Sequence, residues 1–99
     1  MTEFQSLCYK TLKQSVPAGS VITYGGLAKL MNRPGAYRAV GSAMNKNPFA
    51  PEVPCHRVVK ANGDLGAYAF GGELKQKRLQ EEGVFVINNR IVNFKEICL

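Results

Sequence analysis

This chain has no long apolar run, no paired-cysteine motif and only one histidine. No hydrophobic stretch approaches the length needed to cross a bilayer, and residues 1–5 do not resemble a signal peptide. The three cysteines are an odd number at wide spacing, without a CxxC pair or a second histidine. They predict free thiols in a reducing intracellular compartment and no structural metal. Internal repeats and low-complexity tracts are also absent.

What is present fits one basic globular domain, residues 1–99. The length and the hydrophobic fraction of 45% allow a single core but leave no room for a separate substrate domain. Thirteen Lys and Arg against seven Asp and Glu give a net charge of +6. Such a charge favours a polyanionic partner such as nucleic acid, and equally fits a basic surface without a specific role.

The first half of the chain predicts mostly helix. Apolar side chains at spacings of three and four predict a helix over about residues 3–15, with Cys8 on its apolar stripe as a core residue. Residues 20–24 are β-branched and predict a short strand. Residues about 25–46 predict two short helices joined by the glycine-containing turn 32–35, which is a helix-turn-helix. The small residues of the second helix suit close approach to DNA, or equally tight packing onto the first helix.

A further helix is predicted in the second half, over about residues 73–82. It is highly charged, with Leu74 and Leu79 facing inward and Gly83 as its C-terminal cap. Together with the first half, this pattern predicts a fold that is mainly α with small β elements, a winged-helix-like domain containing a helix-turn-helix.

Three non-helical segments complete the prediction. A proline-rich connector leads into the segment 54–58, which begins a short apolar stretch, and residues 66–72 form a flexible loop suited to a lid or pocket wall. Residues about 84–94 alternate around Asn88-Asn89 and predict a hairpin. Cys98 is expected to be frayed and exposed.

The pair Cys55-His56 is the strongest chemical signal in the chain. A histidine with a near-neutral pKa can take a thiol proton, directly or through one water, and the thiolate is the nucleophilic form of cysteine. The pair therefore predicts nucleophilic chemistry at Cys55. By itself it also fits a buried, inert cysteine beside an unrelated histidine, because neighbouring side chains on a strand point to opposite faces.

The surroundings of this pair resemble those of one family. The chain resembles the C-terminal, catalytic domain of the O6-alkylguanine-DNA alkyltransferases, the methylated-DNA-protein-cysteine methyltransferases, over about residues 3–83. The resemblance is carried by Tyr24, Arg38-Ala39-Val40-Gly41, Asn47-Pro48, Pro54-Cys55-His56-Arg57-Val58, the loop 66–72 and Glu82-Gly83.

The resemblance implies a single-use DNA-repair enzyme without a cofactor. The O6 alkyl group of a flipped guanine would move to Cys55, which is not regenerated. His56, through a water, would be the general base, and Glu82 would hold and polarise it. Asn47 would support the active-site turn.

DNA would be bound from the minor-groove side through the helix-turn-helix. Arg38 would enter the base stack in place of the flipped guanine, offsetting part of the cost of unstacking. Tyr24 would sit beside the displaced nucleotide and donate a hydrogen bond to the guanine ring. The other DNA contacts that the resemblance implies are Gly25, Arg33 and Ala61.

The pocket loop would complete the substrate site. Tyr68 would close over the base, while backbone groups of Val58 and Ala69 read the guanine edge. Phe70 stands where many relatives have a small residue, and we expect it to favour methyl and ethyl groups over benzyl. Tyr37 departs from the family beside Arg38, where it would either contact DNA or hinder approach.

The expected partner is double-stranded DNA containing O6-alkylguanine, bound by a monomer with no membrane role. The expected compartment is the cytoplasm, or the nucleus in a eukaryote. Most relatives carry an N-terminal domain, with a zinc site in some, that we expect to be missing here.

Two other functions compete. A non-catalytic lesion-binding protein similar to the alkyltransferase-like proteins would share the base-flipping residues, but such proteins usually carry tryptophan or alanine at the position of Cys55. A sequence-specific helix-turn-helix regulator would explain the charge, but would leave residues 54–58, Tyr68 and Glu82 without a purpose.

Overall fold

The computed structural model describes all residues from 1 to 99 and is mainly helical. The predicted fold class is confirmed, because the chain forms a small, mainly helical domain with short strands. The elements in chain order are α1 (Glu3–Ser15), β1 (Ile22–Thr23), α2 (Tyr24–Leu30), α3 (Tyr37–Asn45), the 3-10 helix η1 (Cys55–Arg57), β2 (Val58–Val59), α4 (Gly72–Glu81), β3 (Val86–Ile87), β4 (Arg90–Ile91) and α5 (Phe94–Ile97).

Local chemistry explains where α1 begins and ends. The Thr2 hydroxyl accepts from the Gln5 backbone N–H, and the Gln5 side chain accepts from the Thr2 N–H, which is a capping box. The helix stops at Val16 because Pro17 follows. The predicted bounds of this helix are therefore confirmed, and Cys8 lies fully buried on its inner face.

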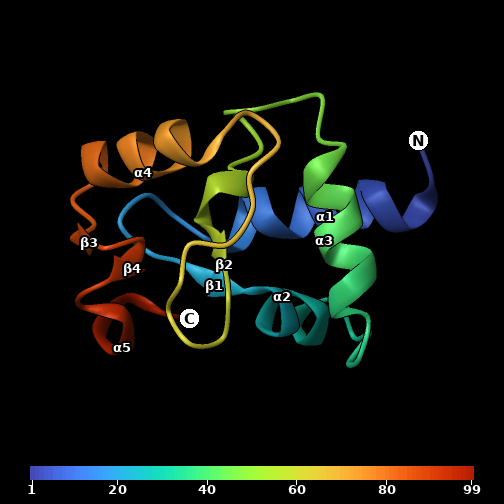
Figure 1. The fold of residues 1–99 in the computed structure, drawn as a ribbon. Helices are drawn as coiled ribbons and strands as arrows, with labels where there is room; N and C mark the ends of the chain where they lie inside the picture. Colours follow the sequence, from blue (N-terminus) through green and yellow to red (C-terminus); the bar gives the residue numbers. More distant parts are fainter.

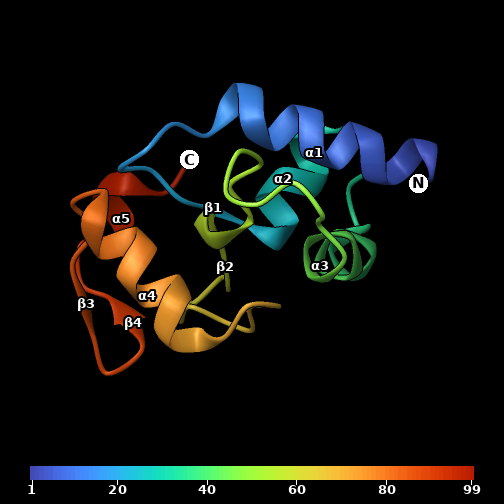
Figure 2. The ribbon, with the colours of Figure 1, turned by 90° about the horizontal axis from the view of Figure 1, so that it is seen from above.

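Two apolar cores lie on either side of the short parallel pair β1–β2. Figures 1 and 2 show α1, α2 and α3 grouped on one side, with α4, β3, β4 and α5 on the other. The larger core joins α1, α2 and α3 and includes Cys55; the smaller lies under α4 and the hairpin. The parallel register pairs Ile22 with Val58, so the reactive segment emerges between the two groups.

The hairpin prediction is confirmed, with Asn88 and Asn89 at positive φ in the turn. The prediction of a frayed, exposed Cys98 is wrong. After the hairpin the chain forms α5, and Cys98 then forms a parallel bridge with Val21 and is only partly exposed. The Leu99 N–H donates to the Val21 carbonyl at 2.9 Å, so the tail is held beside the residue that precedes β1.

The loop after β2 is tied to this C-terminal segment. Leu65 N–H donates to the Asn89 carbonyl, and Ile91 N–H donates to the Gly63 carbonyl. Gly63 has φ of +90°, and a Cβ there would lie 3.3 Å from the Phe94 ring. Positive φ and the close ring together require glycine at this position.

None of the helices is long and apolar enough to cross a membrane.

A pair of glycine substitutions tests the anchoring of this loop. Gly63→Ala adds strain at positive φ and a clash with Phe94, so we expect a loss of about 2–4 kcal/mol in unfolding free energy. Gly83→Ala is the control, because Gly83 has φ of +88° but no atom within 4 Å of its Cβ position. It should cost only the strain, about 1–2 kcal/mol. Urea denaturation measures both, and equal losses would show that Phe94 does not hold the loop.

Candidate active site

Cys55 and His56 both point into the protein, because they lie on the tight turn of η1 rather than on a strand. Pro54 opens the turn, and the Arg57 N–H donates to the Pro54 carbonyl. On a strand the two side chains would face opposite ways, but here Cys55 is 3% exposed and His56 is 2% exposed. The turn therefore makes the adjacent thiol and imidazole members of one site.

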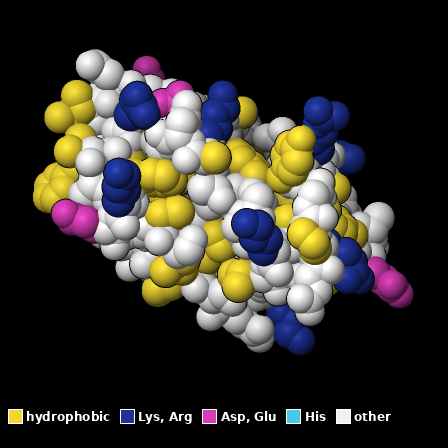
Figure 3. All heavy atoms as spheres, turned by 90° about the horizontal axis from the view of Figure 1, so that it is seen from below, with side chains coloured by type: hydrophobic (Ala, Val, Ile, Leu, Met, Phe, Trp, Pro, Cys, Tyr) yellow, Lys and Arg dark blue, Asp and Glu magenta, His cyan; other side chains and the backbone are white.

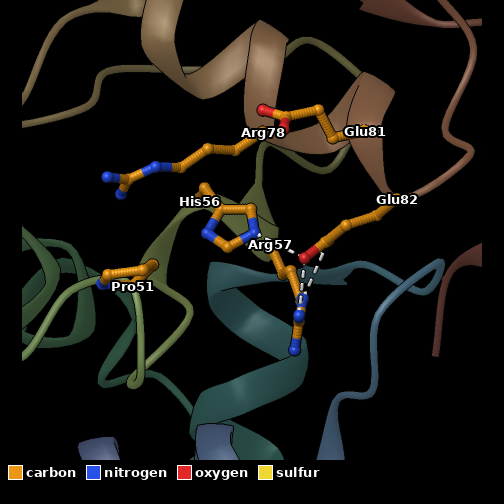
Figure 4. Close-up of a pocket in the computed structure, with 6 residues that line it drawn as sticks. All are labelled: Pro51, His56, Arg57, Arg78, Glu81 and Glu82. Carbon is orange, nitrogen blue, oxygen red and sulfur yellow. Dashed lines mark hydrogen bonds and ion pairs between the residues drawn. The ribbon is translucent and has the colours of Figure 1, made fainter.

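The His56 ring is held in one orientation by Glu82. His56 Nε2 lies 3.0 Å from Glu82 Oε2, and a carboxylate can only accept, so Nε2 carries the hydrogen when the ring is neutral. Nδ1 is then the free acceptor, and it is buried with no hydrogen-bond partner. Figure 4 shows this second nitrogen on the side of the ring that faces away from Glu82.

Arg57 also binds Glu82 and fixes its orientation. Its Nε donates to Glu82 Oε1 at 2.9 Å, and its second terminal nitrogen donates to Oε2 at 2.6 Å. The remaining terminal nitrogen donates to the Val16 carbonyl at the end of α1, at 2.8 Å. This bidentate pair fixes the carboxylate plane against which His56 is oriented.

The electrostatics keep the imidazole neutral and the carboxylate charged. Burial lowers the pKa of His56, the hydrogen bond and charge of Glu82 oppose that shift, and the cations Arg57 and Arg78 add to it. Burial alone would raise the pKa of Glu82, but the hydrogen bonds from Arg57 and His56 hold it below its usual value. A neutral histidine with a free Nδ1 can accept a proton at physiological pH.

An open hollow of about 400 Å³ lies beside His56, Arg57 and Glu82. Figure 4 shows its lining residues, which come from the turn before η1, from η1 itself and from the end of α4. They are Pro51, His56, Arg57, Arg78, Glu81 and Glu82. Cys55 is not among them, so this hollow borders the histidine but not the thiol.

Asn47 holds the segment that leads to Cys55. Its amide nitrogen donates to the Val53 carbonyl at 2.9 Å, and its amide oxygen accepts from the Phe49 N–H at 2.9 Å. The side chain is 4% exposed. Asn47 thus braces the connector that leads into η1.

Two tyrosines and a lysine surround the Cys55 thiol. Burial raises the pKa of Tyr24 and of Tyr68, and the nearby Cys55 raises both further. Lys75 is fully buried, and its Nζ donates to the Val58 carbonyl at 2.8 Å and to the Ala67 carbonyl at 3.2 Å. Lys75 therefore links β2 to the pocket loop just behind the thiol.

The position of Lys75 corrects the prediction for this helix. Leu79 faces inward as predicted, but Leu74 is only partly buried and Lys75 takes the inner position. The spacing predicts burial of Lys75, because it is four residues before Leu79 and so lies on the same face of the helix. Its charge argues against burial, since lysine is almost never fully buried without a partner.

The residues expected at the DNA lie on the surface around a second hollow of about 320 Å³. It brings together Tyr24, Gly25 and Ala61 with Thr23, Tyr37 and Lys60. Arg38 is exposed on α3, with its guanidinium 5.8 Å from the Tyr37 ring centre, and Arg33 is exposed in the turn before it. Figure 3 shows this face with many Lys and Arg side chains and with acidic side chains toward its rim.

The remaining predicted pocket residues divide into two groups. Tyr68 packs against the core that contains Cys55, and Val58 is fully buried with its carbonyl already bonded to Lys75. Ala69 is exposed on the loop, beside the half-exposed Phe70. Sequence reasoning assigned no role to Arg57, Lys75 or Arg78, although Arg57 stood within the recognised segment 54–58.

The buried Lys75 predicts a change of stability with pH. Burial lowers its pKa from 10.5 to about 8, so between those values the unfolded chain binds a proton that the folded protein does not. Stability therefore rises through this pH range by at most about 3 kcal/mol from this group. We expect the stability of the wild type relative to Lys75→Met to increase from pH 8 to 10, as measured by urea denaturation. A constant difference would place the lysine pKa near its ordinary value.

Comparison with known proteins gives the family. The profile described as "6-O-methylguanine DNA methyltransferase, DNA binding domain" matches residues 3–84. The methylated-DNA–protein-cysteine methyltransferase of Methanosarcina mazei is 51% identical over 81 residues, which are 82% of this chain and 51% of that protein. The chain spans about half the length of the curated relatives it matches.

Solved structures agree with the sequence relatives. Mycobacterium tuberculosis OGT in complex with DNA has a TM-score of 0.80 at 43% identity, and the match covers 83% of this chain and 50% of that one. S. pombe Atl1, in complex with damaged DNA containing O6-carboxymethylguanine, has a TM-score of 0.84 at 30% identity. That match covers all of this chain and 96% of Atl1. The chain therefore belongs to the 6-O-methylguanine DNA methyltransferase family and contains its DNA-binding domain.

Proposed function

We propose that this protein repairs DNA by moving the O6 alkyl group of guanine to Cys55 in a single, irreversible step. The observation that carries the proposal is the state of His56. Its Nε2 is committed to Glu82, while its Nδ1 is buried, unpartnered and adjacent in sequence to the buried thiol. The site thus offers a nucleophile and an oriented base.

The chemistry follows from these positions. His56 Nδ1 takes the thiol proton through one water, and Sγ attacks the alkyl carbon as the bond from that carbon to guanine O6 breaks. Glu82 stabilises the imidazolium that forms, and Arg57 keeps the carboxylate in place. The product is a stable thioether. Because the alkyl group is not removed from Sγ again, each molecule acts once.

DNA binding is proposed through the basic face around α2 and α3. The charge of this face and the family's DNA complexes support duplex DNA as the partner. In this proposal Arg38 replaces the flipped base in the stack, while Tyr24 contacts the displaced nucleotide. Gly25, Arg33 and Ala61 contact the DNA backbone from the same face. A single copy of the protein is enough to bind the duplex.

The guanine would lie between Cys55 and the pocket loop. Tyr68 closes over it, and the backbone of Val58 and Ala69 reads its edge. We expect a narrow pocket in this protein, because Tyr68 packs on the Cys55 core and Phe70 contacts Tyr68 edge to face, with ring centres 5.3 Å apart. This geometry favours small alkyl groups.

A second candidate is a lesion-binding protein without transfer activity. The match to Atl1 favours it, since the two chains have nearly the same extent and superimpose throughout. The presence of Cys55 beside the oriented His56 favours transfer.

Intact mass decides between the two. After incubation with a duplex containing O6-methylguanine, we expect the protein to gain the mass of one CH₂ group, located on Cys55 by peptide mapping. Cys55→Ala should bind the same duplex without the gain, while Cys8→Ala, which removes a thiol buried on α1, should still be methylated. Tight binding of the lesion by the wild type with no mass change would establish the lesion-binding function instead.

A further inference from the structure

Arg78 does not make the ion pair that its place on α4 offers. It precedes Glu81 by three residues and Glu82 by four, the spacings at which charges on a helix surface meet. It forms no ion pair with either one, and Glu82 is instead occupied by His56 and Arg57. Figure 4 shows the Arg78 guanidinium reaching past His56, on the side of the ring away from Glu82.

The guanidinium goes to the pocket loop. One terminal nitrogen of Arg78 donates to the Tyr68 hydroxyl oxygen, and the group also lies 5.9 Å from the centre of the Phe70 ring. Tyr68 and Phe70 contact each other edge to face. Arg78 thus fixes the two aromatic side chains of the loop against α4.

The direction of this hydrogen bond determines what the Tyr68 hydroxyl can do. A guanidinium has only donors, so the phenol oxygen must accept, and its own proton is left for another acceptor. Tyr68 also packs against the apolar core that contains Cys55, and its phenol pKa is raised by burial and by the nearby Cys55. Tyr68 therefore lies next to both Arg78 and the thiol.

We propose that Arg78 is a positioning residue that aims the Tyr68 hydroxyl at the oxygen that leaves when Cys55 is alkylated. This inference rests on the proposed function. As Sγ bonds to the alkyl carbon, the electron pair of the breaking carbon–oxygen bond stays on guanine O6, and the Tyr68 hydroxyl donates to it. The guanine anion then takes up the proton that His56 took from the thiol, so the products are the thioether and neutral guanine.

The charge of Arg78 strengthens this donor. Burial raises the pKa of Tyr68, whereas Arg78 lowers it through its charge and hydrogen bond, which makes the phenol a better acid than burial alone would allow. A donor fixed where negative charge develops stabilises the transition state more than the ground state. On the leaving oxygen Arg78 acts through Tyr68, while its separate lowering of the His56 pKa is the same for both leaving groups.

The test varies the leaving group. Single-turnover methyl transfer is followed by intact mass on two duplexes, one with O6-methylguanine and one with O6-methyl-8-azaguanine, whose departing base is the stronger acid. The variants are Arg78→Met, Arg78→Lys, Tyr68→Phe and the double variant Arg78→Met/Tyr68→Phe. Lys77→Met is the control, because it removes the same charge from the exposed side of the same helix.

We expect Arg78→Met to slow transfer from O6-methylguanine about ten- to hundredfold, with much of this loss recovered on the azaguanine substrate. Arg78→Lys should regain part of the rate, Lys77→Met should stay within about twofold of the wild type, and the double variant should be no slower than Tyr68→Phe. If Arg78→Met fails to fold, Tyr68→Phe carries the same comparison of leaving groups.

Equal losses on both substrates, or no loss, would overturn the proposal and leave Arg78 as a residue that only packs the loop. A wild-type protein that gains no methyl group on either duplex would instead overturn the proposed function.

Discussion

The Glu82 carboxylate accepts hydrogen bonds from His56 and from Arg57, and Arg57 donates in turn to the carbonyl at the end of α1. These contacts join the last turn of α4, the η1 turn and the first helix, which are distant in sequence. They also connect the two apolar cores across the short parallel strands. Without the carboxylate, the buried imidazole would lose its hydrogen-bond partner and the largely buried guanidinium would lose its counter-charge, which is costly in a protein interior.

The rest of the site depends on this geometry. The η1 turn buries both Cys55 and His56, Glu82 supplies the partner of the buried His56 ring, and Asn47 braces the approach to the turn. On the opposite side of the thiol, Lys75 and Arg78 tie the pocket loop to α4. Residues of α4 and its C-terminal end therefore hold both the general base His56, through Glu82, and the pocket loop, through Lys75 and Arg78.

The sequence predicted much of this fold, because its local signals are strong. Proline and glycine mark the ends of α1 and α4, and Asn88-Asn89 fixes the hairpin turn. The short range of these signals also explains the errors. The burial of Lys75 and the pairing of Cys98 with Val21 depend on contacts between distant segments, which periodicity does not report.

The candidate site was predicted through a resemblance rather than through spacing. Glu82 is 26 residues from His56, and on pattern alone it was one charge among several at a helix end. Arg57 and Arg78 had no assigned role, because what each one does depends on which carboxylate or phenol the fold places beside it. The sequence composition does not show which arginines belong to the site. Their partners in the folded protein do.

Titration of His56 tests most directly whether Glu82 keeps a buried, neutral base in place. It is the only histidine in the chain, so its ring signals in a proton NMR spectrum need no assignment. We predict a pKa below the ordinary 6.5 in the wild type, and a still lower pKa in Glu82→Gln, because the opposing charge is lost while burial and Arg57 remain. A wild-type pKa above 6.5, or one that rises in Glu82→Gln, would contradict the account.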